Sequence, residues 1–219
     1  MSCELHEIIG DRRSVRNFLS MEVSIDVLRR TLRAATWAPS AHNAQPWRFI
    51  VITDRDTKRR LAEAMASKWS RDLARDNVPR DAANRLVGDS VELFTMAPVL
   101  VIAALTTVDM NKYPDRRRQN AEHTMAVQSL AAAVQNMLLT AHSEGLGSCW
   151  FCAPLFCQDG IRRVLGIPGN VEPQALIAIG YPSGRTDPPP RKALSQIAYK
   201  NSRHRSRPTS APCIFKSTS

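Results

Sequence analysis

The stretch NAEHTMAVQSLAAAVQNMLLTAHSEGLGSCWF, residues 120–151, decides the fold class of this chain. Its apolar residues recur at helical spacing from Met125 to Ala141, so we predict one long helix over residues 120–144. Gly145 is a typical residue for the end of a helix, and a strand over 148–152 should follow it. A helix that is apolar nearly all round needs a second burial surface, which a partner subunit could supply.

Outward from this stretch, short apolar segments alternate with helical patterns. The segments are few and rich in Val and Ile, which is typical of strands covered on both faces. Residues 79–96 are ambiguous and predict only helical pieces under a mobile loop. The predicted strands are 47–53, 98–105, 148–152 and 174–181, and the other predicted helices are 1–11, 24–35, 58–75 and 158–165. The sequence therefore predicts an α+β fold with one sheet between helices.

Length and composition indicate one substantial domain. The chain has 219 residues, of which 43% are hydrophobic, and it has no apolar run long enough to span a membrane. Glu4, Glu7 and Asp11 interrupt the start of the chain, so we expect no secretory signal and a cytoplasmic protein. We expect one domain over residues 1–198 and a basic, disordered tail over 199–219.

The formal charge of +10 is concentrated at one end of the chain. Asp187 is the last acidic residue, and seven of the 30 Lys and Arg residues follow it. The remaining 23 basic residues face 20 acidic ones, which is nearly balanced. This distribution disfavours nucleic acid as a partner of the folded part.

Three of the five cysteines lie close together, at Cys149, Cys152 and Cys157. A closed zinc site would need a second Cys or His pair at ligand spacing, and an iron–sulfur cluster a fourth nearby Cys, so we expect no metal. The run SCWFCAP reads as a buried strand, and we interpret Cys149 and Cys152 as small buried residues in it. A redox-active CxxC is the alternative.

Two segments carry groups suited to a polar ligand. Residues 12–16, RRSVR, offer rigid guanidinium forks and a hydroxyl that suit phosphate, although a solvated charge run is the alternative. Residues 39–47, PSAHNAQPW, place amides and a hydroxyl before a buried strand, where they can hydrogen bond a flat polar ring or simply form a turn. Gly145 and Gly147 could admit a ligand close to the backbone, or serve as a plain helix cap and turn.

The chain offers binding groups without an evident nucleophile. It contains no GxGxxG or P-loop motif, and neither an HExxH sequence nor a Ser–His–Asp signature stands out. Such a chain suits an enzyme whose cofactor carries the reactivity while the protein supplies placement and electrostatics.

Taken together, RRSVRNF (12–18), PSAHNAQPW (39–47), the long helix ending in EGLGSCW (144–150) and ALIAIGYP (175–182) resemble the nitroreductase-like flavoprotein superfamily. The resemblance covers roughly residues 5–198. It implies a three-layer sandwich with a central, mostly antiparallel sheet, a domain-swapped homodimer and bound FMN. NADH or NADPH would be the electron donor.

The same resemblance implies a role for each part of the site. Arg12 and Ser14 would hold the FMN phosphate, completed by Arg191 or Lys192, and Arg16 would contact the pyrimidine edge of the flavin. Residues of the 39–47 segment would contact the flavin of the other subunit, and the backbone of residues 152–155 would lie against its central ring. The complete set of predicted cofactor-binding residues is Arg12, Arg13, Ser14, Arg16, Pro39, Ser40, Asn43, Gln45, Cys152, Ala153, Pro154, Leu155, Arg191 and Lys192.

One branch of the superfamily resembles the chain more specifically. Residues from Tyr113 to Cys157 are similar to the C-terminal flavin domain of the bifunctional enzyme that builds a deazaflavin coenzyme. This implies hydride transfer from reduced FMN to a flat conjugated substrate, such as a dehydro precursor of that coenzyme, a nitroaromatic, a quinone or an enone. A non-catalytic protein that stores FMN or uses it for regulation is the alternative.

Overall fold

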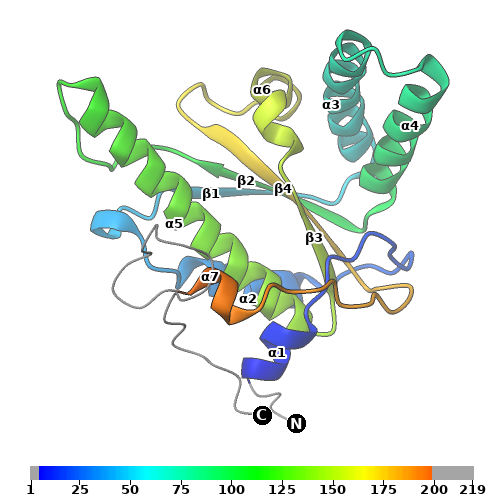
Figure 1. The fold of residues 1–219 in the computed structure, drawn as a ribbon, viewed down its shortest axis with the longest axis horizontal. Coiled ribbons are helices and arrows are strands. Elements are labelled where there is room, and N and C mark those ends of the chain that lie inside the picture. The colour runs from blue at the N-terminus through cyan, green and yellow to red at the C-terminus, as the bar shows by residue number, and fades with distance from the viewer. Residues whose placement is uncertain (1–4, 199–219) are drawn as a thin grey trace. The chain divides into compact units, whose positions relative to one another are not determined.

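The computed structural model describes residues 5–198. The chain forms two units, Met1–Thr186 and Asp187–Ser219, and the tail predicted over 199–219 lies outside the described residues. Figure 1 shows the elements, which are α1 (Leu5–Asp11), α2 (Ile25–Thr36), η1 (Ala41–Asn43), β1 (Trp47–Ile52), α3 (Arg55–Arg75), α4 (Arg80–Met96), β2 (Val99–Leu105), α5 (Arg116–Ser143), β3 (Gly147–Phe151), η2 (Ala153–Phe156), α6 (Gln158–Leu165), β4 (Glu172–Gly180) and α7 (Leu194–Ile197).

The four strands form one antiparallel sheet in the order β1-β2-β4-β3. In its register Val101 of β2 pairs with Val51 of β1 and with Ile177 of β4. Every residue of β2 is buried, because the strand lies inside the sheet and helices cover both of its faces. The predicted antiparallel sheet flanked by helices is therefore confirmed.

The pleat of β2 sends alternate side chains into two separate cores. Val101 and Leu105 belong to the core formed with α2 and α5, whereas Leu100 and Ile102 belong to the core formed with α3, α4 and α6. Figure 1 shows these two groups of helices on opposite sides of the sheet. The first unit is thus an α+β sandwich of helices, sheet and helices.

Helix α5 begins four residues earlier than the apolar pattern predicts. The side chain of Asp115 caps it by accepting a hydrogen bond from the Arg118 amide at 2.9 Å. Its buried stripe of small residues, including Ala126 and Ala133, packs against α2 as well as against the sheet. Helix α2 therefore supplies a second burial surface for α5 within the same chain.

The structure corrects the prediction for residues 79–96, which form the single helix α4 and not separate pieces under a loop. The helix packs along α3, and Phe94 is its one fully buried residue. The sequence pattern does not predict this helix as one element because two of its apolar residues, Leu86 and Met96, are exposed. The apolar residues therefore do not form one continuous face. The described residues contain no helix long and apolar enough to cross a membrane.

Candidate functional site

The RRSVR segment is attached to the edge strand β3 by backbone contacts. The Val15 amide donates to the Ser148 carbonyl at 3.0 Å, next to a parallel bridge between Ser14 and Ser148. Farther along, the Leu19 amide donates to the Tyr181 carbonyl at 2.9 Å. The structure therefore brings together two of the sequence motifs, residues 12–18 and the end of EGLGSCW.

The two glycines of EGLGSCW serve this arrangement in different ways. Gly145 has a φ of 78° after α5, which confirms it as a helix cap. A Cβ on Gly147 would lie 2.7 Å from the Cβ of Val15, so this glycine lets the RRSVR segment approach β3. Gly147 is thus explained by chain packing, and the close approach of a ligand at this glycine is not required.

The extended segment turns alternate side chains outward. Val15 is buried, whereas Ser14 and Arg16 are exposed. Arg13 donates through Nη1 to the carbonyls of Gly10, at 2.5 Å, and of Arg12, at 2.9 Å, so its guanidinium is held by the segment's own backbone. Within residues 5–198, the guanidiniums of Arg12 and Arg16 make no hydrogen bond or ion pair. Two unneutralised cations and a hydroxyl therefore face outward from one short segment.

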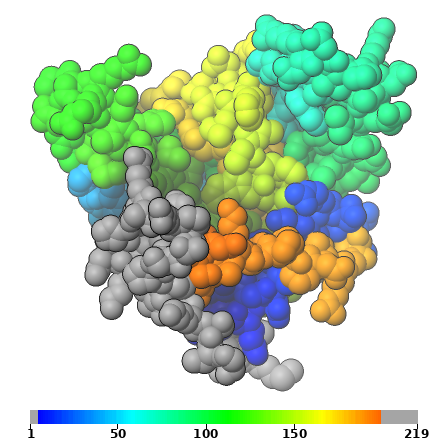
Figure 2. All heavy atoms as spheres, in the orientation of Figure 1, coloured from blue at the N-terminus to red at the C-terminus, as the bar shows by residue number. Residues whose placement is uncertain are grey.

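The turn after β3 lies next to this segment. Strand β3 ends at Phe151, and the η2 turn that follows buries Pro154 but leaves Leu155 exposed. On the surface, the dark-blue atoms of the RRSVR region lie beside the yellow-green atoms of the residues that follow β3 (Figure 2). Of the predicted residues, Arg16, Cys152 and Ala153 line the same pocket, so the turn meets the RRSVR segment at Arg16.

The structure divides the CxxC pair. Cys149 is buried in β3, as predicted, but Cys152 lies just beyond the strand and is exposed, which corrects its interpretation as a buried strand residue. Burial raises the pKa of the Cys149 thiol, an effect that Arg16 and Ser14 partly offset, and burial raises the pKa of Cys157 to about 11. Redox-active thiols have lowered pKa values, so this environment disfavours a redox pair. No cluster of three or more His, Cys, Asp or Glu side chains in the described part of the chain is arranged to hold a metal ion.

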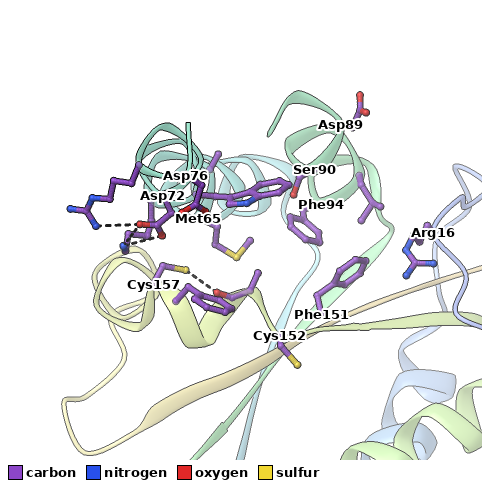
Figure 3. A pocket seen from close by; sticks show the side chains of 17 residues that line it. Arg16, Met65, Asp72, Asp76, Asp89, Ser90, Phe94, Phe151, Cys152 and Cys157 are labelled. Atoms are coloured by element: carbon purple, nitrogen blue, oxygen red, sulfur yellow. Dashed lines mark hydrogen bonds and ion pairs between the residues drawn. The ribbon is translucent and has the colours of Figure 1, made fainter. Parts of the chain in front are cut away.

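A pocket of about 780 Å³ opens between α3, α4 and the turn after β3 (Figure 3). Its walls combine four aromatic side chains with aliphatic and charged ones, and the rings of Phe94 and Phe151 meet edge to face with centroids 5.0 Å apart. Arg16 lies at one end, 5.9 Å from the centroid of the Phe151 ring, and the ion pair of Lys68 with Asp72 lies at the other. The remaining walls include Met65, Trp69, Leu93, Phe156 and Cys157.

Sequence reasoning missed this pocket. Trp69 lies in the helix predicted over 58–75, and the structure leaves it 39% exposed at the pocket. Phe156 is 71% exposed on η2 beside it. In the sequence, Trp69 and Phe156 are simply large aromatic residues, and Trp69 lies next to charged ones. They indicate a pocket only when α3 and η2 are known to be neighbours in the fold.

The PSAHNAQPW segment lies at the other edge of the sheet, directly before the edge strand β1 (Figure 1). The structure therefore does not bring Pro39, Ser40, Asn43 and Gln45 to the RRSVR segment of the same chain. Three residues of this loop, none of them glycine, have a left-handed backbone: φ is 56° at His42, 54° at Asn43 and 45° at Gln45. Such conformations persist only where the surroundings hold them, and they concentrate at functional sites.

Arg191 and Lys192 belong to the second unit. Arg191 donates to the Pro189 carbonyl at 3.5 Å within that unit. Their assignment to a phosphate site stays a prediction.

The groups beside β3 fit a ligand with an anionic end and a flat ring, as FMN has. Arg12 and Arg16 have no anionic partner among the described residues, and Ser14, an exposed residue whose side chain also hydrogen bonds Cys149, lies between them in the segment. The aromatic pocket begins at Arg16 and Phe151 and offers apolar walls. Phosphate and a planar heterocycle would therefore both find suitable groups here.

Comparisons with known proteins identify the family of the chain. Residues 9–181 match the sequence pattern of the Nitroreductase family. The chain is 33% identical over 179 residues to a provisionally named NADH dehydrogenase/NAD(P)H nitroreductase of Methanothermobacter thermautotrophicus, an alignment that covers 81% of this chain and 76% of that protein.

Two solved structures share the fold. A BluB-like flavoprotein of Clostridium difficile 630 is 29% identical, with a TM-score of 0.76, over 92% of this chain and 100% of that one. A provisionally named nitroreductase of Desulfovibrio desulfuricans in complex with FMN is 25% identical, with a TM-score of 0.69, over 93% of this chain and 100% of that one. The chain therefore belongs to the nitroreductase family.

Proposed function

We propose that this chain is an FMN-dependent oxidoreductase that passes a hydride from reduced flavin to a flat conjugated organic molecule. The observation that carries the proposal is the convergence beside β3 of the outward-facing Arg12, Ser14 and Arg16, the turn at 152–155 and the aromatic pocket. The FMN complex of the Desulfovibrio relative supports the choice of cofactor.

The residues of the chain bind and polarise, and the flavin supplies the hydride when it is bound. Arg12 and Ser14 hold the phosphate through a charge-assisted and a neutral hydrogen bond. Arg16 faces the pyrimidine edge, where its positive charge stabilises the negative charge of the reduced ring. The rings of Phe151 and Phe156 hold a flat substrate and exclude water, which strengthens these interactions.

The protein works as a domain-swapped homodimer in this proposal. Pro39, Ser40, Asn43 and Gln45 contact the flavin of the second copy, and Arg191 or Lys192 completes the phosphate site. Two features support this reading: the loop lies at the opposite edge of the sheet from Arg12, and its backbone is strained. NADH or NADPH is the electron donor, in line with the name of the Methanothermobacter relative.

The acceptor is a flat molecule such as a nitroaromatic, a quinone, an enone or a dehydro precursor of a deazaflavin coenzyme. The pocket volume of about 780 Å³ and its aromatic walls suit such a ring system. The alternative function, storage or sensing of FMN, requires the same cofactor contacts but no turnover.

Absorbance of the purified protein separates these functions. We expect a yellow protein whose flavin bands bleach under NADH or NADPH without oxygen and return when an acceptor is added. A yellow protein that no donor and acceptor pair turns over would support storage. A protein that is colourless and cannot be reconstituted with FMN would refute both.

Substitutions in the pocket separate substrate binding from cofactor binding. Phe156→Ala and Trp69→Ala should raise KM for the acceptor by more than they raise the Kd for FMN, because both rings line the pocket and neither belongs to the predicted cofactor contacts. Val108→Ala is the matched control, since Val108 is an exposed apolar residue outside the pocket. Unchanged KM in both pocket variants would mean that the substrate binds elsewhere.

A further inference from the structure

Glu122 is a buried carboxylate within the apolar stripe of α5. It is 2% exposed, and its Oε2 has no hydrogen-bond partner among the described residues. Its Oε1 lies 3.3 Å from Nε2 of His42, the residue at the centre of the PSAHNAQPW loop. A buried carboxylate costs free energy unless it is well paired, so this position would be more stable with an apolar residue. Packing alone therefore does not account for Glu122.

The same face of α5 holds the loop at a second point. The amide of Ala41 donates to the Ser129 hydroxyl at 3.2 Å, and that hydroxyl donates to the Met125 carbonyl at 2.7 Å. Ser129 follows Glu122 by seven residues, about two helical turns, so both side chains lie on one face of the helix. Helix α5 thus contacts the loop at His42 and at the residue before it.

The contact with Glu122 constrains the His42 ring as well as its backbone. Nε2 of His42 donates to the Glu122 Oε1 when it carries the ring hydrogen, and it accepts from the Asn111 Nδ2 when it does not. Asn111, in the segment between β2 and α5, places its side-chain amide 3.2 Å from the same Nε2. The His42 ring therefore contacts both Glu122 of α5 and Asn111 of the segment that precedes α5.

We propose that Glu122 is a positioning residue that holds His42, and with it the loop over residues 39–46, in its left-handed backbone conformation. Held in this way, Ser40 and Asn43 are presented to the flavin of the second copy. This inference rests on the proposed function for that last step only. Glu122 itself touches neither cofactor nor substrate.

The first test follows the loop in protein free of FMN. We expect Glu122→Leu to raise amide hydrogen exchange across residues 41–45 by about tenfold or more, as the loss of one charge-assisted hydrogen bond implies. Glu122→Gln keeps an acceptor for His42 and should restore most of the protection. Val134→Ala is the control, because it opens a cavity on the same helix at a fully buried, apolar residue of the core formed with α2 and α5.

A double variant tests whether Glu122 acts through the His42 backbone. Glycine adopts a positive φ without steric cost and has no ring for Glu122 to contact. In the His42→Gly background, amide hydrogen exchange of the loop should therefore no longer depend on the residue at position 122. We therefore expect Glu122→Leu to change loop exchange in the wild-type background and not in the His42→Gly background. Equal effects in both backgrounds would overturn the positioning role, and so would equal loop exchange in Glu122→Leu and Val134→Ala.

The second test measures FMN affinity. Glu122→Leu should weaken FMN binding by about tenfold, and Glu122→Gln should rescue it, with kcat of the fully loaded enzyme unchanged. A changed loop with unchanged FMN affinity would overturn the link between the loop and the cofactor. A wild-type protein that binds no FMN would overturn the proposed function, and loop exchange would still decide the role of Glu122.

Discussion

Gly147 and Val15 lie so close that a Cβ on the glycine would be 2.7 Å from the Cβ of the valine. The contact joins the first residue of β3 to the segment that carries Arg12, Ser14 and Arg16. The placement of Arg12, Ser14 and Arg16 therefore depends on the absence of a side chain at Gly147.

Gly147→Ala should displace the RRSVR segment, because neither the strand backbone nor Val15 can yield easily. We expect a loss of about 1–3 kcal/mol in the free energy of unfolding, as for other overpacked sites, together with weaker FMN binding. Gly88→Ala is the control: Gly88 lies in α4 with nothing near its Cβ position, and alanine should stabilise the helix by about 0.5–1 kcal/mol. Chemical denaturation and FMN titration would measure both effects, and an unaltered Gly147→Ala protein would show that the segment is free to move.

Arg12→Ala and Ser14→Ala should weaken FMN binding to different degrees. Loss of a charge-assisted hydrogen bond costs about 1.5–3 kcal/mol and loss of a neutral one about 1 kcal/mol. Arg13→Ala is the comparison variant, because the Arg13 guanidinium already donates to the backbone carbonyls of Gly10 and Arg12. We expect Arg13→Ala to lower stability more than affinity. If Arg13→Ala weakens FMN binding while Arg12→Ala leaves it unchanged, the phosphate contact belongs to Arg13 and not to Arg12.

The sequence predicts the elements with strong apolar patterns. The strands β1, β2 and β4 and the helix α6 begin and end within two residues of where their apolar residues indicate. Helix α4 was not predicted as a single helix because its apolar residues Leu86 and Met96 face solvent. The helical spacing of its apolar residues is therefore weak. The end of β3 was placed one residue too late, which put the exposed Cys152 inside the strand.

The candidate site could be predicted only as separate motifs. Pairing of Val15 with Ser148 uses backbone atoms, which leave no pattern in side-chain types. The pocket joins Trp69 to Phe151 across two elements that are far apart in the chain, and the sequence does not show that they are neighbours. His42 looked like an isolated histidine because its partner, Glu122, lies 80 residues away.

Alkylation by iodoacetamide should distinguish the cysteines by their environments. Burial raises the pKa of Cys157 to about 11, so at pH 8 only about one Cys157 thiol in a thousand is the reactive thiolate. Its labelling rate should rise about tenfold for each pH unit up to about pH 11, and Cys149 should also react slowly. Cys152 is exposed and should react first at pH 8. Peptide mass mapping would follow each site, and early labelling of Cys157 would mean that the pocket opens in solution.

Replacement of Cys149 and Cys152 by Ser should leave turnover largely intact. The buried Cys149 has a raised pKa, which is the opposite of what thiol redox chemistry requires, and the flavin carries the electrons. The measurement is kcat with NADH or NADPH, normalised to bound FMN and checked against folding. Loss of activity with FMN content and unfolding free energy unchanged would reveal a redox-active pair.

Trp37 offers the sharpest test of the homodimer. It is 78% exposed at the end of α2 and directly precedes the loop over residues 39–46. Leu5, Ile9 and Ile25 are also exposed on α1 and α2, which both pack against α5. Exposed apolar residues that gather on one part of a surface are typical of interaction sites, and tryptophan often contributes most to their affinity.

Trp37→Glu should therefore weaken dimerisation by about 2 kcal/mol or more, roughly thirtyfold in the dimer dissociation constant. FMN affinity should fall with it, because the partner's Ser40 and Asn43 are expected to contact the flavin. Leu86→Glu is the matched control, since Leu86 is an exposed apolar residue on α4 and should leave both properties unchanged. Sedimentation equilibrium with absorbance detection reads the mass and the flavin content together. A wild-type monomer that retains its flavin would refute the dimer, and a Trp37→Glu dimer as tight as wild type would show that the two copies meet through another face.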